Sequence, residues 1–137
     1  RGLNYGDAVF ETIRVSAGKV LFWEDHYFRL MASMRIMRME IPMTLTPEFL
    51  ESELLKTVQS VGDSNKTYRT KLLVWRNEGG KYTPTAKDVS FVITSEVLET
   101  PFYTINDNAY EVELFKDHYV TSGLLSTLKT NMPIVYF

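Results

Sequence analysis

Apolar and polar side chains alternate over residues 8–15, and Val, Thr and Ile, which favour extended backbone, are among them. Four residues typical of a turn, 16–19, follow and lead into the apolar residues 20–23. The pattern therefore predicts a β-hairpin at the start of the chain.

Two amphipathic helices are predicted next. Over residues 25–39 the apolar positions recur at helical spacing on one face: Tyr27, Leu30, Met31, Met34 and Met37. We expect Pro42 to end this helix, because the residue before a proline resists the helical conformation. Thr46 and Pro47 form a typical helix start, and helical spacing then continues to Gly62.

The remaining pattern predicts strands over 68–76, 89–94 and 109–116, with a glycine-rich turn at 77–84. This order of elements is typical of an α+β fold, in which helices cover one side of an antiparallel sheet.

We predict three segments along the chain. Residues 1–102 form a small α+β domain, 103–108 a linker, and 109–137 the incomplete start of a larger domain. The chain begins at Arg1 and stops within an apolar stretch, so we expect a fragment of a longer protein.

Composition narrows the classes of function. The net charge is −2, from 15 Lys and Arg against 17 Asp and Glu, and the basic residues are scattered. This predicts no binding to nucleic acid or to a membrane. Cysteine is absent, which excludes disulfides and thiol chemistry. Without a signal-peptide pattern, the protein is predicted to be cytoplasmic.

Lys129 is the only charged residue between Tyr119 and Phe137, and its neighbours are mostly apolar or hydroxyl-bearing. A Schiff base forms from an unprotonated amine, which burial in apolar surroundings favours. The alternative is a surface lysine whose stem packs on the protein while its ammonium group reaches water. Taken alone, the local sequence favours this alternative, because catalytic lysines are rare.

Arg29 lies at the edge of the apolar stripe of the first predicted helix. Its guanidinium group makes it a candidate phosphate ligand, with a surface ion pair as the alternative. The two histidines, His26 and His118, have no partner at ligand spacing, so no metal site is predicted.

Four segments, in order, resemble the class IV aminotransferases. These are the fold type IV enzymes that use pyridoxal 5'-phosphate (PLP), and they include branched-chain and D-amino-acid aminotransferases and aminodeoxychorismate lyase. Residues 1–15 contain the family's tyrosine–glycine pair and Phe-Glu strand, and residues 24–30 its Glu-x-His-x-x-Arg-Leu stretch. Residues 72–84 resemble the strand and loop over the active site. Residues 126–131, Ser-Thr-Leu-Lys-Thr-Asn, resemble the lysine motif.

The resemblance implies the small domain of a fold type IV enzyme and a role for each site residue. Lys129 would bind PLP as a Schiff base and carry the proton between substrate and cofactor, while Arg29 would hold the PLP phosphate. Tyr5 and Phe10 would line the substrate side, with Tyr68 a weaker candidate. A homodimer that binds a small-molecule amino acid and a 2-oxo acid is also implied.

Three functions stay open. The leading one is transamination between a branched-chain-like amino acid and a 2-oxo acid. The second is pyruvate-releasing aminodeoxychorismate lyase chemistry in the folate pathway, which the Gly-Gly-Lys-Tyr turn at 79–82 favours. The third is a non-catalytic interaction domain with a structural Lys129. Asn131 departs from the family pattern because no tyrosine follows it, so the partner of the cofactor ring oxygen is not assigned.

Overall fold

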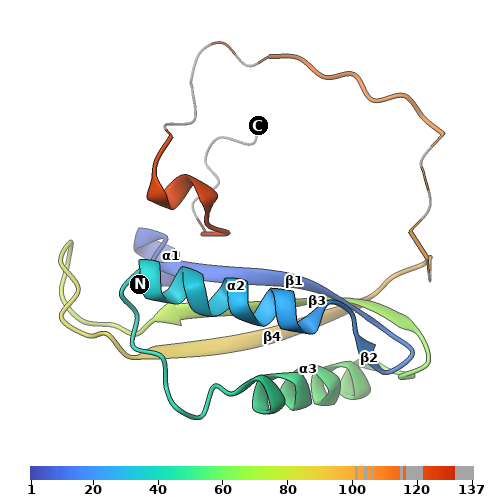
Figure 1. Cartoon of the computed structure of the whole chain (residues 1–137), viewed down its shortest axis with the longest axis horizontal. Helices are drawn as coiled ribbons and strands as arrows, with labels where there is room; N and C mark the ends of the chain where they lie inside the picture. The colour runs from blue at the N-terminus through green and yellow to red at the C-terminus, as the bar shows by residue number, and fades with distance from the viewer. Residues whose placement is uncertain (101, 104, 106, 115, 117–121, 132–137) are drawn as a thin grey trace.

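A four-stranded antiparallel sheet with two main helices forms the body of the chain (Figure 1). The computed structural model describes residues 1–100, 102, 103, 105, 107–114, 116 and 122–131. The strand order is β2-β1-β3-β4, and the α+β class predicted from the sequence is confirmed. The bounds of the elements are α1 Gly2–Tyr5, β1 Ala8–Ser16, β2 Lys19–Val20, α2 Trp23–Ile36, α3 Pro47–Val61, β3 Thr67–Arg76, β4 Val89–Val97 and the 3-10 turn η1 Leu124–Thr127.

Strand β1 lies inside the sheet, between β2 and β3, and every second side chain along it faces the helices. It pairs with β3 along its whole length, from Ala8 opposite Trp75 to Ser16 opposite Thr67. Successive side chains of a strand point to opposite faces. The face covered by helices therefore receives the buried residues Val9, Glu11, Ile13 and Val15, and the other face receives Phe10, Thr12, Arg14 and Ser16.

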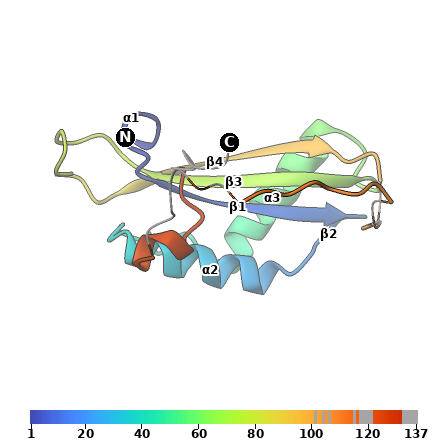
Figure 2. The same cartoon turned by 90° about the horizontal axis from the view of Figure 1, so that it is seen from above.

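Both helices pack on this one face of the sheet (Figure 2). Helix α2 lies mainly against β1, and α3 mainly against β4. Thr46 caps α3 by accepting a hydrogen bond from the backbone N–H of Phe49, as the sequence predicted. The shared core comes from the sheet and both helices and includes Val9, Ile13, Leu30, Met34, Leu50, Leu54, Leu72 and Val74.

Helix α2 ends earlier than predicted, at Ile36 and not at Met39. Arg38 adopts the left-handed conformation, with φ 55°, and the Arg76 guanidinium from β3 donates to the carbonyl oxygens of Met37 and Arg38. These long-range hydrogen bonds satisfy carbonyls that a longer helix would have used itself. Pro42 is therefore not what ends the helix.

Two predicted strands were also wrong. The second strand is limited to Lys19–Val20, because Phe22 has a φ of 53° and α2 begins at Trp23. Residues 109–114 and 116 are exposed and form no strand. An alternating sequence forms a strand only beside another strand, and the sheet in the described part of the chain consists of β2, β1, β3 and β4. The division into domain, linker and second domain stays a prediction.

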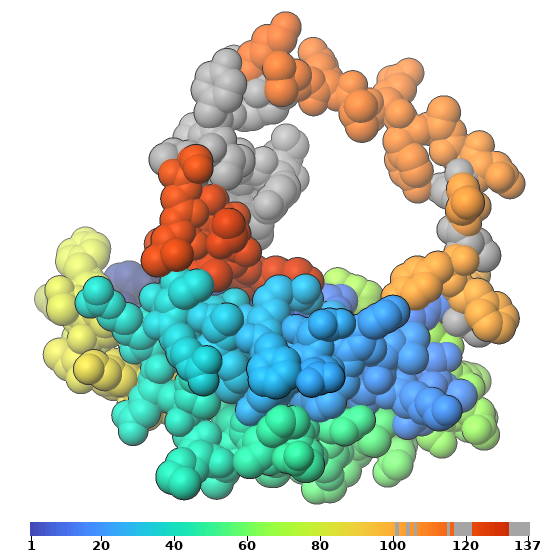
Figure 3. Space-filling model, viewed as in Figure 1, coloured from blue at the N-terminus to red at the C-terminus, as the bar shows by residue number. Residues whose placement is uncertain are grey.

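Near its end the described chain returns to the body of the molecule (Figure 3). Thr130 forms an isolated antiparallel bridge with Val9. The N–H of Phe10 donates to the carbonyl of Lys129, and the N–H of Asn131 donates to the carbonyl of Ala8. Residues 129–131 thus lie along β1, within reach of Glu11. In the part of the chain that the structure describes, every helix is too short or too polar to span a lipid bilayer.

Candidate functional site

A buried carboxylate stands at the centre of the candidate site. Glu11 lies in the middle of β1 on the helix-covered face, and its side chain is only 2% exposed. A buried charge is costly unless it is paired and hydrogen-bonded. Helix α2 supplies His26 and Arg29, which lie one turn apart and so share a face. We call these three residues and Lys129 the Glu11 cluster.

Arg29 donates two hydrogen bonds to the Glu11 carboxylate. Its Nε donates to Oε1 at 2.7 Å and its Nη2 to Oε2 at 2.6 Å, which is the bidentate fork typical of an arginine–carboxylate pair. Its Nη1 has no hydrogen-bond partner among the described residues, and the side chain is 47% exposed. Arg29 therefore keeps N–H groups for an external anion.

His26 completes the support of the carboxylate. Its Nδ1 lies 2.8 Å from Glu11 Oε2. An ionised carboxylate only accepts hydrogen bonds, so Nδ1 must carry the proton and donate it. The 3.1 Å contact between Nδ1 and Arg29 Nη2 is then not a hydrogen bond, since both atoms are donors.

Lys129 reaches the same oxygen from the other end of the chain. Its Nζ lies 3.6 Å from Glu11 Oε2, and its backbone is held by the N–H of Phe10. Its side chain is 43% exposed, which is the surface position that the local sequence favoured and not the apolar burial considered for a Schiff-base lysine. The apolar neighbours Leu124 and Leu125 are themselves exposed and do not enclose it.

The electrostatics of the cluster favour the charged carboxylate. Burial alone would raise the pKa of Glu11. The hydrogen bonds from Arg29 and His26, with the charges of Lys129 and Arg29, outweigh burial and lower that pKa below its ordinary value. The hydrogen bond to Glu11 in turn raises the pKa of Arg29. Glu11 and Arg29 are therefore both charged at neutral pH.

The predicted substrate residues lie in three different places. The Phe10 ring lies on the opposite face of the sheet from Glu11, with Lys71 Nζ 4.7 Å from its centre. Tyr5 is 41% exposed and packs edge-on against Tyr82. Tyr68 is fully buried, and its hydroxyl donates to the carbonyl of Asp63. It offers no surface to a substrate, so the geometry does not support that role.

A second ionic cluster lies at the start of β1. Asp7 Oδ2 accepts hydrogen bonds from Arg76 Nε at 2.9 Å and from Arg1 Nε at 3.0 Å. Arg1 Nη1 also donates to the carbonyls of residues 79–81, and Arg76 donates to two carbonyls at the end of α2. Both arginine side chains are 5% exposed. We call this the Asp7 cluster.

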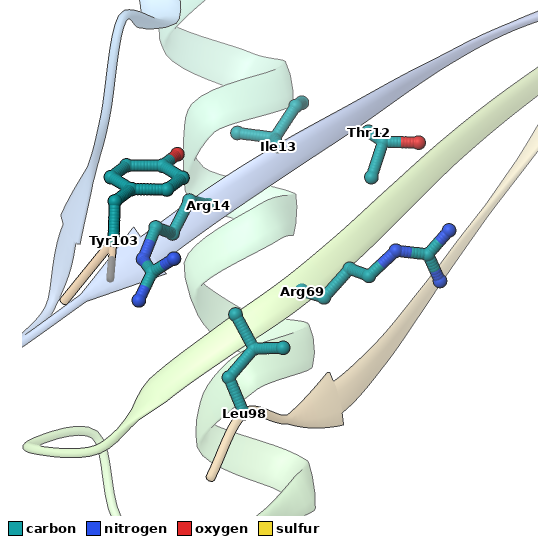
Figure 4. A pocket seen from close by; sticks show the side chains of 6 residues that line it. All are labelled: Thr12, Ile13, Arg14, Arg69, Leu98 and Tyr103. Atoms are coloured by element: carbon teal, nitrogen blue, oxygen red, sulfur yellow. The ribbon is translucent and has the colours of Figure 1, made fainter. Parts of the chain in front are cut away.

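A cavity of about 230 Å³ lies on the other side of the sheet from Glu11 (Figure 4). Its lining includes Thr12, Arg14, Arg69 and Tyr103. Arg14 is engaged with the carbonyl of Thr100 and the ring of Tyr103, and Arg69 is paired with Glu96. The cavity is thus separate from the Glu11 cluster, and its cations already have partners.

Arg29 and Lys129 were predicted from the sequence, but Glu11 and His26 were given no role there. Both residues stand inside segments that carry the family resemblance, at 1–15 and 24–30. A sequence signal for Glu11 was present, because an acid at an inward position of a central strand requires partners. His118 lies outside the described residues. Among those residues, no group of His, Cys, Asp and Glu could hold a metal ion.

Comparison with known proteins assigns the family. The sequence pattern described as Amino-transferase class IV matches residues 8–131, a range that contains the whole Glu11 cluster. The chain belongs to the class IV aminotransferase family. No curated protein sequence matches it significantly.

Solved structures share the fold of this class IV chain. The branched-chain amino acid aminotransferase of Escherichia coli matches with a TM-score of 0.58 and 21% identity, over 69% of this chain and 32% of its own. The branched-chain aminotransferase of the archaeon Thermoproteus uzoniensis, solved with norvaline, matches with a TM-score of 0.58 and 26% identity. The match covers 69% of this chain and 33% of the archaeal protein. A Legionella pneumophila protein provisionally named 4-amino-4-deoxychorismate lyase matches with a TM-score of 0.69 and 20% identity. The match covers 94% of this chain and 45% of the Legionella protein. The chain therefore spans less than half the length of these relatives.

Proposed function

We propose that the protein containing this chain is a PLP-dependent aminotransferase that moves an amino group between a branched-chain-like amino acid and a 2-oxo acid. The observation that carries the proposal is the meeting of Arg29 and Lys129 at one carboxylate, although they stand far apart in the sequence. A phosphate ligand and a reactive amine are the two groups that PLP requires of a protein.

The residues present fit the cofactor chemically. Arg29 has an unengaged Nη1 and an exposed side chain, as a ligand for phosphate requires. The Lys129 amine is accessible to an aldehyde, since its only described partner is Glu11 at 3.6 Å. When bound, PLP would supply the electron sink that weakens bonds at the amino-acid α-carbon.

The chain's own residues would then bind, orient and move a proton. Arg29 would fix the phosphate end, and Lys129 Nζ would hold the aldehyde end and later accept and return the substrate proton. Glu11 and His26 would keep Arg29 in place. Tyr5 and Phe10, a homodimer and a cytoplasmic location stay predictions.

Aminodeoxychorismate lyase activity is the second candidate. The structure that covers 94% of this chain carries that provisional name. The glycine-rich turn also favours it. Gly80 has a φ of 70°, and a Cβ there would lie 2.0 Å from the carbonyl oxygen of Thr83, so the turn requires glycine.

Two measurements on the full-length protein test these functions. Amino transfer from glutamate to a branched-chain 2-oxo acid supports the aminotransferase, and pyruvate release from aminodeoxychorismate supports the lyase. Incubation with PLP should give a yellow absorbance band that borohydride bleaches and that Lys129→Ala abolishes. An identical band in wild type and Lys129→Ala would reject both functions and leave the non-catalytic interaction domain.

A further inference from the structure

The Glu11 carboxylate is the one atom group that His26, Arg29 and Lys129 all contact. We infer that Glu11 is a positioning residue of the cofactor site. Its carboxylate holds the phosphate-binding guanidinium and the reactive amine at a set place relative to each other. The inference rests on the proposed function, since it concerns how that site is assembled.

The bidentate pair determines the orientation of Arg29. Two parallel hydrogen bonds, at 2.7 and 2.6 Å, fix the plane of the guanidinium group as well as its position. In this orientation Nε and Nη2 point at Glu11, and Nη1 remains for another ligand. A surface arginine without such a partner would sample many rotamers and lose that freedom only when an anion binds.

The position of Glu11 makes it a rigid anchor. It stands in the middle of β1, opposite Leu72 of β3, and β1 is paired with β3 along its whole length. Helix α2 and residues 129–131 each pack on β1 through separate contacts. Glu11 contacts side chains from both of these segments.

The charges of the cluster leave a cationic excess toward solvent. One buried carboxylate faces two cations, Arg29 and Lys129, whose side chains are about half exposed, and outside the cluster Asp25 is the further acid that acts on Arg29. Glu11 therefore assembles the cations without cancelling them. An anionic group such as a phosphate monoester is the ligand that this arrangement favours.

The test compares Glu11→Gln with a matched control. Glutamine keeps the size of Glu11 but loses the charge. Glu96→Gln removes a carboxylate that also pairs with an arginine, Arg69 at 2.7 Å, but on the exposed surface of β4. In cofactor-free protein, the Arg29 Nε–H signal in nitrogen–proton NMR spectra should be slow to exchange. It should be lost in Glu11→Gln and retained in Glu96→Gln.

A second arm measures the effect on the amine. After incubation with PLP and borohydride, peptide mass spectrometry gives the fraction of Lys129 that is modified. We expect that fraction, at a fixed early time, to fall about tenfold in Glu11→Gln, because Arg29 loses the charged hydrogen-bond partner that orients it for the PLP phosphate. Glu11→Asp keeps the charge and should recover part of the labelling, and Glu96→Gln should behave as wild type.

The outcomes separate this inference from the proposed function. An unchanged Arg29 signal in folded Glu11→Gln would overturn the claim that Glu11 positions Arg29. Unchanged Lys129 labelling would overturn the claim that Glu11 affects the reaction of the Lys129 amine. If wild-type protein takes up no PLP, the proposed function fails, and the cofactor-free Arg29 signal alone decides about the anchor.

If Glu11→Gln does not fold, a pH titration of the wild-type chain tests the inference instead. The carboxyl carbon of Glu11 and the Arg29 Nε–H should then titrate with one midpoint, below the ordinary pKa of glutamate. Independent midpoints would overturn the inference.

Discussion

The Asp7 and Glu11 clusters are built from the same parts and differ in what they leave unused. Each has a buried carboxylate, just before β1 or within it, that accepts hydrogen bonds from an arginine of another element. In the Asp7 cluster, backbone carbonyls take further arginine N–H groups, and both arginines are almost wholly buried. In the Glu11 cluster, Arg29 and Lys129 remain about half exposed.

The difference teaches how an ionic cluster becomes a site. An ion pair whose arginines are almost wholly buried joins segments together, and it presents few N–H groups to a ligand in solvent. A pair that satisfies the carboxylate but leaves N–H groups at the surface can still bind an anion. The first arrangement makes the Asp7 cluster structural, and the second makes the Glu11 cluster a candidate for chemistry.

Loss of Arg76 should have the largest effect on stability. Arg76→Met removes a buried partner of Asp7 and two hydrogen bonds to the end of α2. We expect the free energy of unfolding to fall by roughly 3 kcal/mol, as for other broken buried pairs. Urea denaturation measures this. Arg69→Met, which removes an exposed pair, is the control, with an expected loss of about 0.5 kcal/mol. Equal losses would contradict the distinction between buried and exposed pairs.

The second largest loss of stability is expected from the turn at residues 79–81, whose carbonyls accept hydrogen bonds from Arg1. Gly80→Ala places a methyl group against the carbonyl of Thr83 at a φ of 70°. We expect a loss of about 2 kcal/mol in thermal or urea unfolding. Gly18→Ala has a similar φ but open space around it, so it should lose only about 1 kcal/mol. A Gly80→Ala protein as stable as Gly18→Ala would show that the close contact is relieved.

The contribution of Glu11 to the free energy of unfolding should depend on pH. Because the folded-state pKa of Glu11 is lowered, its contribution to stability is present above the ordinary glutamate pKa and is lost as pH falls through the lowered value. Near neutral pH, Glu11→Gln should cost about 1 to 2 kcal/mol. That difference from wild type should shrink on acidification. A difference that stays constant down to about pH 3 would contradict the lowered pKa.

Lys129 should matter least for stability. Its amine lies 3.6 Å from Glu11 and is exposed, and such pairs contribute little to folding. Lys129→Ala should therefore change the free energy of unfolding by less than about 0.5 kcal/mol while it abolishes PLP incorporation. A large loss of stability would indicate a structural lysine.

Local signals predicted most of the fold. The Thr46 cap and the periodicity of the apolar residues located α3, and alternation located β1 and β3. The end of α2 could not be predicted, because Arg76, which binds the carbonyls there, is distant in sequence. The strand expected over 109–116 failed for a related reason, since pairing depends on a partner strand.

The candidate site was predicted only in its exposed members. Arg29 and Lys129 follow from motifs, but their meeting at Glu11 depends on the packing of α2 and residues 129–131 against β1. The local sequence of Lys129 favoured a surface lysine, and its side chain is 43% exposed. Apolar neighbours in sequence bury a side chain only if they fold over it, and Leu124 and Leu125 do not.

The central claim, that the Glu11 cluster is the open, anion-binding one, is tested most directly by titrating the cofactor-free chain with inorganic phosphate. The arginine Nε–H signals in NMR spectra report the binding. We expect the Arg29 signal to move until it saturates, while the signals of Arg1 and Arg76 stay in place. The movement should disappear in Glu11→Gln. An Arg29 signal that phosphate leaves unchanged, or an Arg76 signal that moves as far, would contradict the claim.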